Sequence, residues 1–544
     1  MQRRYLALWF PYLASERLRR RACAGPDEGR HSLPPACGGE GLGMGGRKAG
    51  RGHSSALRRA ALPPNPPHRK RRRAIPSVPL DRGAASQHGP QVIQKAAYKP
   101  ETTDVTTGFA AIPASGSYVL RNARAPACLI EAGSPAGDRD GLALLDIADE
   151  DGGFAPLLPA GTPALDALPS LDLDGGIALP RLVDVHTHLD KGHIWPRRPN
   201  PDGSFMGALS AVAADREANW SAGDVRVRME FGLRCAYAHG TAAIRTHLDS
   251  LPPQETISWP VFEKVRERWK GRIDLQGACL FGIDTGRDEA WFQTLVQRVR
   301  QAGGVLGAVP FMVPDIEQLL DMIFRAAIEN DLPLDFHADE TDALEAVSLR
   351  LIAEAAKRNG YEGRILIGHC CSLARQPDDE VLRTLDAVAD CNISVVSLPM
   401  CNMFLQDRRS DNTTPRWRGV TLLHEMKARG INVCVASDNT RDPFYAYGDL
   451  DMIEVYRMAT RIIQFDHPVA DWPKAALSNP AKAMGLSEDC GRLVEGGPAD
   501  FLICEGRSWT EILSRPESGR IVVRDGKVID RALPSYEELD HLME

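Results

Sequence analysis

The sequence predicts an α/β protein whose main domain, residues 181–487, is a (β/α)₈ or TIM barrel. Eight short apolar runs follow one another in this region, and each precedes a stretch of helical composition. Strands that alternate with helices form parallel β/α units, and eight such units close into a barrel. The runs end, in chain order, at His186-Thr187-His188, His247, Phe281–Asp284, Val309–Phe311, His337–Glu340, His369, Leu398–Asn402 and Ser437–Asn439.

Short β segments flank the predicted barrel. Residues 117–180 contain YVLRNARAPACLIE, GLALLDIADEDGG and LDLDGGIALPRLVDVH, which alternate like strands joined by Gly/Asp turns. Residues 488–535 show the same strand-like alternation in GRLVEGGPADFLICEG and GRIVVRDGKVID. In the second of these, Asp525-Gly526 is a hairpin signal. We expect both segments to form one small β-sandwich domain.

The first 116 residues differ in composition. Residues 22–116 are rich in Pro, Gly and Arg and are predicted to be a disordered basic linker. The motif HRKRRR within it is either a nucleic-acid-binding patch or a solvated basic tract, and we favour the second interpretation. Residues 1–21, MQRRYLALWFPYLASERLRRR, resemble the N-terminus of ImuB-like, Y-family-related DNA polymerase proteins. No polymerase carboxylate motif follows, so we expect a fused or extended gene model whose working part starts near Tyr118.

Charge and cysteine usage narrow the class of protein. Residues 1–100 carry a net charge of +15 and the remainder −22, and the acidic remainder argues against nucleic acid as a partner. The 12 cysteines form no CxxC pair, which favours reduced thiols and a cytoplasmic location. No apolar run approaches 18 residues, so no membrane span is expected.

Metal-ligand residue types stand at the ends of several runs, where TIM barrels carry their chemistry. His186 and His188 are two residues apart, so in a strand both imidazoles face one side and can reach one ion. Neutral imidazole suits zinc or ferrous iron. His337 can add a ligand at another strand tip. Asp438 ends an apolar strand, and such a buried carboxylate needs a cation or good hydrogen bonds.

Four further residues at the strand ends are candidates for other roles. Glu340, just past His337, can carry a proton between water and substrate, or it can be a helix N-terminal acid. His369 can be catalytic, a ligand or structural. His247 and Asp249 lie at the second strand end, where they can line the pocket or support the ligands.

The segment from about 117 to 530 resembles the cytosine deaminase-like branch of the amidohydrolase superfamily, the metal-dependent hydrolase type of TIM barrel. The matching motifs are HTHLDKG, GTAAIRTHLD, LDFHADE, GHC, PMCNMFLQDRR, PRWRGVTLLHEMKARGINVCVASDNTRDPFYAYGDLDM and NPA. The resemblance implies one divalent ion, Fe²⁺ or Zn²⁺, held by His186, His188, His337 and Asp438. It implies that Glu340 shuttles protons and that His369, beside Asp438, polarises the attacking water.

Two departures from this branch concern the substrate. Cytosine deaminases carry a base-reading Gln after the third strand, where this chain has Phe281-Gly282, and Asn439 stands where a second Asp is common. We therefore include these three residues in the predicted substrate site. The expected function is hydrolytic deamination of cytosine or a related amino-substituted nitrogen heterocycle. The alternative is hydrolysis of a cyclic amide or N-substituted aminoheterocycle of triazine or pterin type. The resemblance also implies a homo-oligomer.

Overall fold

A computed structural model of the chain describes residues 109, 111–112, 116–131, 134–515 and 519–544. The predictions for residues 1–21 and for nearly all of the linker at 22–116 lie outside the described residues. Everything described belongs to one compact unit, Pro100–Glu544.

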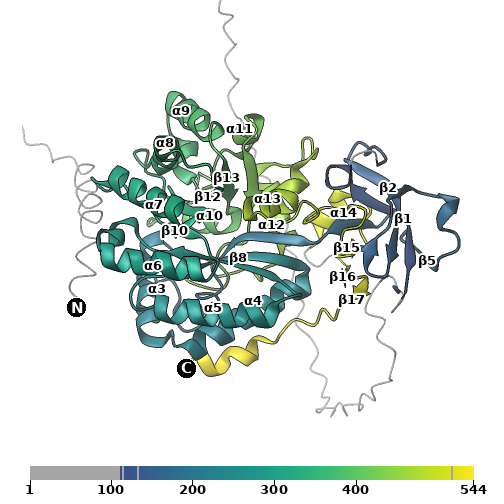
Figure 1. The fold of residues 1–544 in the computed structure, drawn as a ribbon, viewed down its shortest axis with the longest axis horizontal. Coiled ribbons are helices and arrows are strands. Elements are labelled where there is room, and N and C mark those ends of the chain that lie inside the picture. The colour runs from purple at the N-terminus through teal and green to yellow at the C-terminus, as the bar shows by residue number, and fades with distance from the viewer. Residues whose placement is uncertain (1–108, 110, 113–115, 132–133, 516–518) are drawn as a thin grey trace, which may run out of the picture. The chain divides into compact units, whose positions relative to one another are not determined.

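Eight parallel strands form the barrel (Figure 1), which confirms the predicted fold class. They pair in two groups, the first three strands and the last five. Parallel bridges Ala278↔Val305 and Gly282↔Val309 join the groups on one side, and Thr187↔Asp438 closes the barrel on the other. The strands are β7 (Leu182–Thr187), β8 (Thr241–Asp249), β9 (Asp274–Leu280), β10 (Leu306–Ala308), β11 (Leu334–Ala338), β12 (Ile365–His369), β13 (Ile393–Ser397) and β14 (Asn432–Val435).

Helices surround the strands and bury an apolar stripe against them. In α7, for example, Leu319, Leu320, Ile323, Phe324 and Ala327 recur at helical spacing and are all buried. None of the described helices combines the length and apolar character needed to cross a membrane. The α-helices are α3 (Phe205–Asn219), α4 (Ala222–His239), α5 (Glu255–Trp269), α6 (Glu289–Gln301), α7 (Ile316–Asn330), α8 (Ser348–Asn359), α9 (Asp378–Ala389), α10 (Pro399–Leu405), α11 (Leu423–Ala428), α12 (Met452–Ile463), α13 (Ser478–Met484) and α14 (Trp509–Ser514). The 3₁₀ helices are η1 (Ala127–Leu129), η2 (Pro163–Leu165), η3 (Ile283–Arg287), η4 (Cys371–Arg375), η5 (Trp472–Ala476) and η6 (Tyr536–Leu542).

The seventh barrel strand ends earlier than its sequence run suggested. β13 stops at Ser397, and α10 starts at Pro399. Proline suits the first position of a helix because the backbone N–H it lacks has no partner there anyway. Asn402, expected at the strand end, therefore lies in the first turn of a helix above the barrel.

The flanking segments form one nine-stranded sheet beside the barrel (Figure 1). Strand β15 from the C-terminal segment pairs antiparallel with β6 from the N-terminal one, and the hydroxyl of Tyr118 donates to the carbonyl of Gly526 at 3.1 Å. Side chains of both segments share one hydrophobic core. The strands are β1 (Tyr118–Pro126), β2 (Leu142–Glu150), β3 (Gly153–Phe154), β4 (Leu158–Pro159), β5 (Ser170–Asp172), β6 (Ile177–Pro180), β15 (Phe501–Cys504), β16 (Arg520–Arg524) and β17 (Lys527–Val528).

Candidate metal centre and active site

Four potential metal ligands converge at the C-terminal ends of the barrel strands. His186 lies in β7 and His188 directly after it, at alternate positions that direct both side chains inward. His337 comes from β11, and Asp438 follows β14. Nε2 of His188 lies 3.3 Å from Nε2 of His337 and 3.3 Å from Oδ1 of Asp438. Nε2 of His186 lies 3.6 Å from the same oxygen.

These atoms fit a divalent cation. Tetrahedral zinc sites with bonds of about 2.0–2.1 Å separate their ligand atoms by roughly 3.3–3.4 Å, close to the distances here. Within the described residues, Nε2 of His186 and both carboxylate oxygens of Asp438 are buried without a hydrogen-bond partner. Buried polar atoms are costly unless paired, and a cation would satisfy all of them. The site is therefore built for a divalent metal ion.

The protonation states of the ligands agree with this assignment. Burial, and then the neighbouring histidines, lower the pKa of His186 and His337 well below 6.5, so both imidazoles are neutral as a metal requires. Burial, followed by the charge of Lys191, does the same to the pKa of His188. Burial raises the pKa of the Asp438 carboxyl to about 7. A cation would reverse that penalty by favouring the carboxylate.

His247 lies against this group, and its nitrogen atoms also fall within ligand distance of the other histidines. Its ring centroid is 4.1 Å from that of His186. However, Nε2 of His247 lies 2.9 Å from Oδ1 of Asp335, a carboxylate outside the ligand group, whereas Oδ1 of Asp438 faces the candidate ligand nitrogens of His188 and His186 at 3.3 and 3.6 Å. This geometry favours Asp438 over His247 as the fourth candidate ligand.

Glu340, His369 and Asn402 form a second cluster beside the ligands. The amide nitrogen of Asn402 lies 3.2 Å from Oε1 of Glu340 and 3.0 Å from Nδ1 of His369. Oε1 of Glu340 is 3.4 Å from that same ring nitrogen. Burial, and then the charge of Asp438, raise the pKa of Glu340 well above 4.5. Burial lowers the pKa of His369 to about 3. The acid can thus hold a proton while the imidazole is neutral.

Two residues of the candidate site have backbone conformations that residues other than glycine rarely adopt. His369 has a φ of 71° and Asp438 a φ of 63°, both in the left-handed region. Such conformations cost on the order of 1–3 kcal/mol each and persist where the surroundings impose them, often at functional sites. Here they turn the chain sharply at the ends of the barrel strands.

Asp249 and Asn439, predicted to lie in the substrate site, are held by charged neighbours at the same end of the barrel. Asp249 lies 3.5 Å from Nζ of Lys191 and 2.7 Å from Nη1 of Arg216. The amide nitrogen of Asn439 donates to Asp442 at 2.7 Å. Both residues are nearly buried.

Phe281 and Gly282, the two adjacent residues after the third strand, have different surroundings in the structure. The ring of Phe281 is 1% exposed and packs against Trp291 and Phe292 of α6, so this side chain lies in the core and not with the ligands. The physical reason is that a large aromatic ring gains more from burial than from a polar pocket. A Cβ at Gly282 would lie 2.9 Å from Oδ1 of Asp284 and 3.3 Å from the Phe311 ring.

The structure adds three functional candidates that the sequence does not predict. The sequence places Asn402 at a strand end and indicates no role for it. Lys191 is buried 5.1 Å from the centroid of the Phe444 ring, yet it stands in the same HTHLDKG motif as two ligands. Asp335 lies two residues before His337 in β11, so strand periodicity could have placed it on the ligand face.

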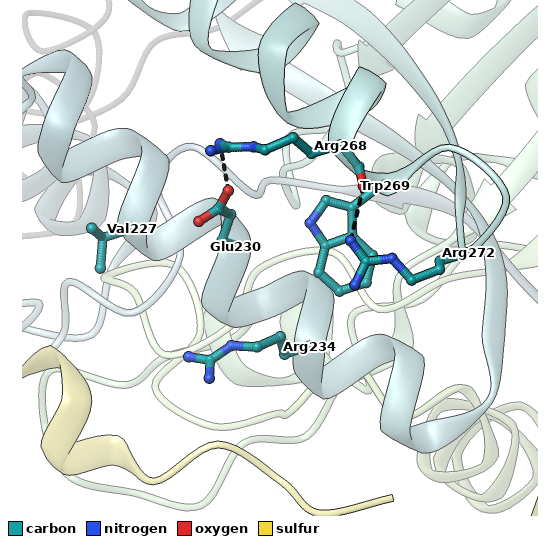
Figure 2. Close-up of a pocket in the computed structure, with 6 residues that line it drawn as sticks. All are labelled: Val227, Glu230, Arg234, Arg268, Trp269 and Arg272. Carbon is teal, nitrogen blue, oxygen red and sulfur yellow. Dashed lines mark hydrogen bonds and ion pairs between the residues drawn. The ribbon is translucent and has the colours of Figure 1, made fainter. Parts of the chain in front are cut away.

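A hollow on the outer surface, between α4 and α5, is separate from this site (Figure 2). Its charges are largely paired, since Glu230 contacts Arg268 and Arg234 contacts Glu538 at 2.6 Å. Arg272 stacks on Trp269 with 4.0 Å to the ring centroid. The lining holds no histidine or cysteine: it consists of Val227, Glu230, Arg234, Arg268, Trp269 and Arg272.

Several known proteins are similar to this chain in sequence or in fold. The chain matches the amidohydrolase family over residues 262–530. It is 54% identical over 432 residues to the pterin deaminase of Rhizobium rhizogenes. This alignment covers 79% of this chain and 98% of that protein. The fold, the site and this likeness define a hydrolase that acts on carbon–nitrogen bonds. The chain belongs to the amidohydrolase family.

More distant proteins are similar over most of their length. The N-isopropylammelide isopropyl amidohydrolase of a Pseudomonas species is 24% identical over 66% of this chain and 89% of its own. A crystal structure of 5-methylcytosine deaminase from Klebsiella pneumoniae, liganded with 5-fluorocytosine, superposes with a TM-score of 0.66. It is 22% identical and covers 77% of this chain and 98% of that one. At this identity the likeness shows a shared fold.

Proposed function

We propose that this protein is a metal-dependent deaminase of a pterin-type heterocycle, which it hydrolyses with release of ammonia. The observation that carries the proposal is the 54% identity to a pterin deaminase across 98% of that protein. This favours the pterin-type alternative over cytosine itself. The lack of a base-reading Gln at Phe281-Gly282 supports the same choice, because a site without that amide loses a direct reader of cytosine.

The chemistry suits pterin as well as cytosine. In both compounds the amino group is on a ring carbon that is double-bonded to a ring nitrogen. Hydrolysis forms a C–O bond at that carbon and breaks the C–N bond to the amino group. One proton of water ends on the ring nitrogen, and the other leaves with the ammonia. The enzyme therefore needs a nucleophile made from water and a group that moves protons.

The proposed ion is zinc or ferrous iron, held by the imidazoles of His186, His188 and His337 and by the carboxylate of Asp438. A divalent cation at such a site supplies a nucleophile at neutral pH, because it lowers the pKa of water from 15.7 to about 7. The free oxygen of Asp438 can accept a proton from the water.

Glu340 is the proposed proton carrier. Burial, and then the charge of Asp438, raise its pKa well above 4.5, in the direction that an efficient general acid requires. It lies within reach of Asp438, since one oxygen of each carboxylate falls within 4.8 Å of the other. Glu340 would protonate the ring nitrogen and then the departing amine.

An ammonia-release assay tests the proposal. The full chain, loaded with zinc or with ferrous iron, is incubated with pterin, cytosine, 5-methylcytosine, isoguanine and an N-alkylated aminotriazine, and both ammonia and alkylamine are measured. We expect pterin to exceed cytosine in kcat/KM by about 10²-fold or more, in the range that polar-edge recognition supports. A higher kcat/KM for cytosine would contradict the assignment. Release of an alkylamine from an N-alkylated triazine, with no ammonia from pterin, would favour N-substituted substrates.

A further inference from the structure

Asn402 lies between Glu340, the proposed proton carrier, and His369. It is fully buried in the first turn of α10, where its backbone N–H donates to the carbonyl of Leu398 at 2.9 Å. Its amide nitrogen reaches Oε1 of Glu340 at 3.2 Å and Nδ1 of His369 at 3.0 Å. A primary amide has two N–H groups, so each of these acceptors can take one.

We infer that Asn402 is a positioning residue that fixes the tautomer of His369 and keeps it from pairing with Glu340. An amide N–H directed at Nδ1 requires that nitrogen to carry a lone pair. A neutral imidazole then has its proton on Nε2. The contact between the Asn402 amide nitrogen and Nδ1 thus selects a single tautomer of the neutral ring.

The selected tautomer directs a donor at the reaction centre. Nε2 of His369 is buried and has no hydrogen-bond partner among the described residues. A ring nitrogen of His369 lies within 4.8 Å of ligand atoms of His186 and Asp438. With its proton there, His369 would donate a hydrogen bond to an oxygen at the centre.

Without the amide, the two residues would interact differently. Oε1 of Glu340 and Nδ1 of His369 are already 3.4 Å apart. If Asn402 donated to neither, the imidazole would gain most by placing its proton on Nδ1 and donating it to the carboxylate. Nε2 of His369 would then present a lone pair to the candidate metal centre. Glu340, the proposed proton carrier, would be hydrogen-bonded to His369. Asn402 therefore prevents His369, the hydrogen-bond donor, from pairing with Glu340, the proposed proton carrier.

The orientation of the amide decides this inference. In the orientation found, the nitrogen has two acceptors and the oxygen, Oδ1, has no partner within the described residues. The flipped amide would put its oxygen against Glu340, which is favourable only if that carboxyl donates a proton. It would also demand a proton on Nδ1 of His369. The tautomer of His369 therefore distinguishes the two orientations.

The direct test is the ¹⁵N NMR spectrum of the full chain, loaded with zinc and labelled at its 14 histidines. The His369→Gln variant assigns the signals of His369 by their loss. We expect Nδ1 to be unprotonated and Nε2 protonated in the native protein. In Asn402→Asp, whose carboxylate only accepts, we expect the proton to move to Nδ1. A protonated Nδ1 in the native protein would overturn the inference, and this result does not depend on whether Asn402→Asp folds.

Kinetics provide a second test, which rests on the proposed function because it requires a substrate. Asn402→Asp and Asn402→Ala should lower kcat for pterin by about 10²–10³-fold, the usual cost of losing one oriented donor, with KM changed by only a few-fold. Zinc content should stay at one ion per chain. Unchanged kcat in both variants would refute the role.

The matched control is Asn432→Asp, the same substitution at the start of β14. Its amide nitrogen donates to Ser394 at 3.0 Å and to the carbonyl of Asn479 at 3.1 Å, at the other end of the strand from Asp438. It should lose stability but keep kcat per folded molecule. If the native chain deaminates none of the panel, the proposed function fails while the NMR result for His369 stands or falls by itself.

Discussion

Nε2 of His247 lies 2.9 Å from Oδ1 of Asp335 beneath the metal site. The two residues come from different strands, β8 and β11, and both are completely or almost completely buried. The other oxygen of Asp335 accepts a hydrogen bond from Arg245 at 3.0 Å. The arginine thus balances the buried carboxylate, which in turn holds the imidazole under the ring of His186. Residues that support metal ligands in this way affect metal affinity without touching the ion.

The first prediction follows from this arrangement. His247→Ala should still bind one metal ion per chain, but with an affinity reduced by about 10–100-fold, as for other supporting residues. Competition with a chelator measures the dissociation constant. His424→Ala is the control, because that ring donates to the carbonyl of Ile463 and packs against the rings of Phe465 and Trp472, away from the ligand group. Complete loss of metal from His247→Ala would make this histidine a ligand.

The second prediction concerns the ligands themselves. His186→Ala and Asp438→Ala should each lose the ion and the activity, because a site with three protein ligands left holds a divalent ion far more weakly. Elemental analysis after dialysis gives the metal content. Full occupancy in both variants would show that the ion binds elsewhere. Removal of the metal from the native protein with a chelator should abolish activity, and added zinc or ferrous iron should restore it.

The third prediction separates proton transfer from metal binding. Glu340→Gln keeps the shape of the side chain and its contact with Asn402 but cannot carry a proton. We expect full metal content and a fall in kcat of about 10²–10⁴-fold. Parallel metal and activity measurements on one preparation decide the matter. If the metal is lost together with the activity, Glu340 is part of the metal site.

The barrel and the convergence of the candidate metal ligands could be predicted because both depend on short-range patterns. His186 and His188 share a strand face by their spacing alone, and the barrel brings all strand ends together. Asn402 could not be placed, because whether β13 continues past Ser397 or a helix starts at Pro399 is decided by packing. The same holds at the third strand, where the structure buries Phe281 in the core. Local sequence does not specify which of two adjacent side chains faces a pocket.

A buried ion pair connects the barrel to the small sheet. Asp451, at the start of α12, pairs with Arg520 of β16, with 2.8 Å between Oδ1 and Nη1. The same carboxylate accepts a hydrogen bond from the backbone N–H of Ile453 and so caps the helix. Burial disfavours the charged carboxylate, but the guanidinium of Arg520 outweighs this effect and lowers the pKa of Asp451 to about 2.

The last prediction is therefore that Asp451→Asn destabilises the protein by about 3–5 kcal/mol near neutral pH, since it removes the carboxylate that pairs with the buried guanidinium of Arg520. The folded pKa lies below the ordinary 3.8, so the pair stabilises the fold fully above about pH 4 and progressively less as the pH falls toward 2. Urea unfolding of native and variant chains, from pH 7 down to the lowest pH at which both fold, measures this difference. The control is Asp315→Asn, whose pair with Arg287 is exposed and should contribute no more than about 1 kcal/mol. A difference between native and Asp451→Asn that is equally small would show that this pair does not hold the barrel and the sheet together.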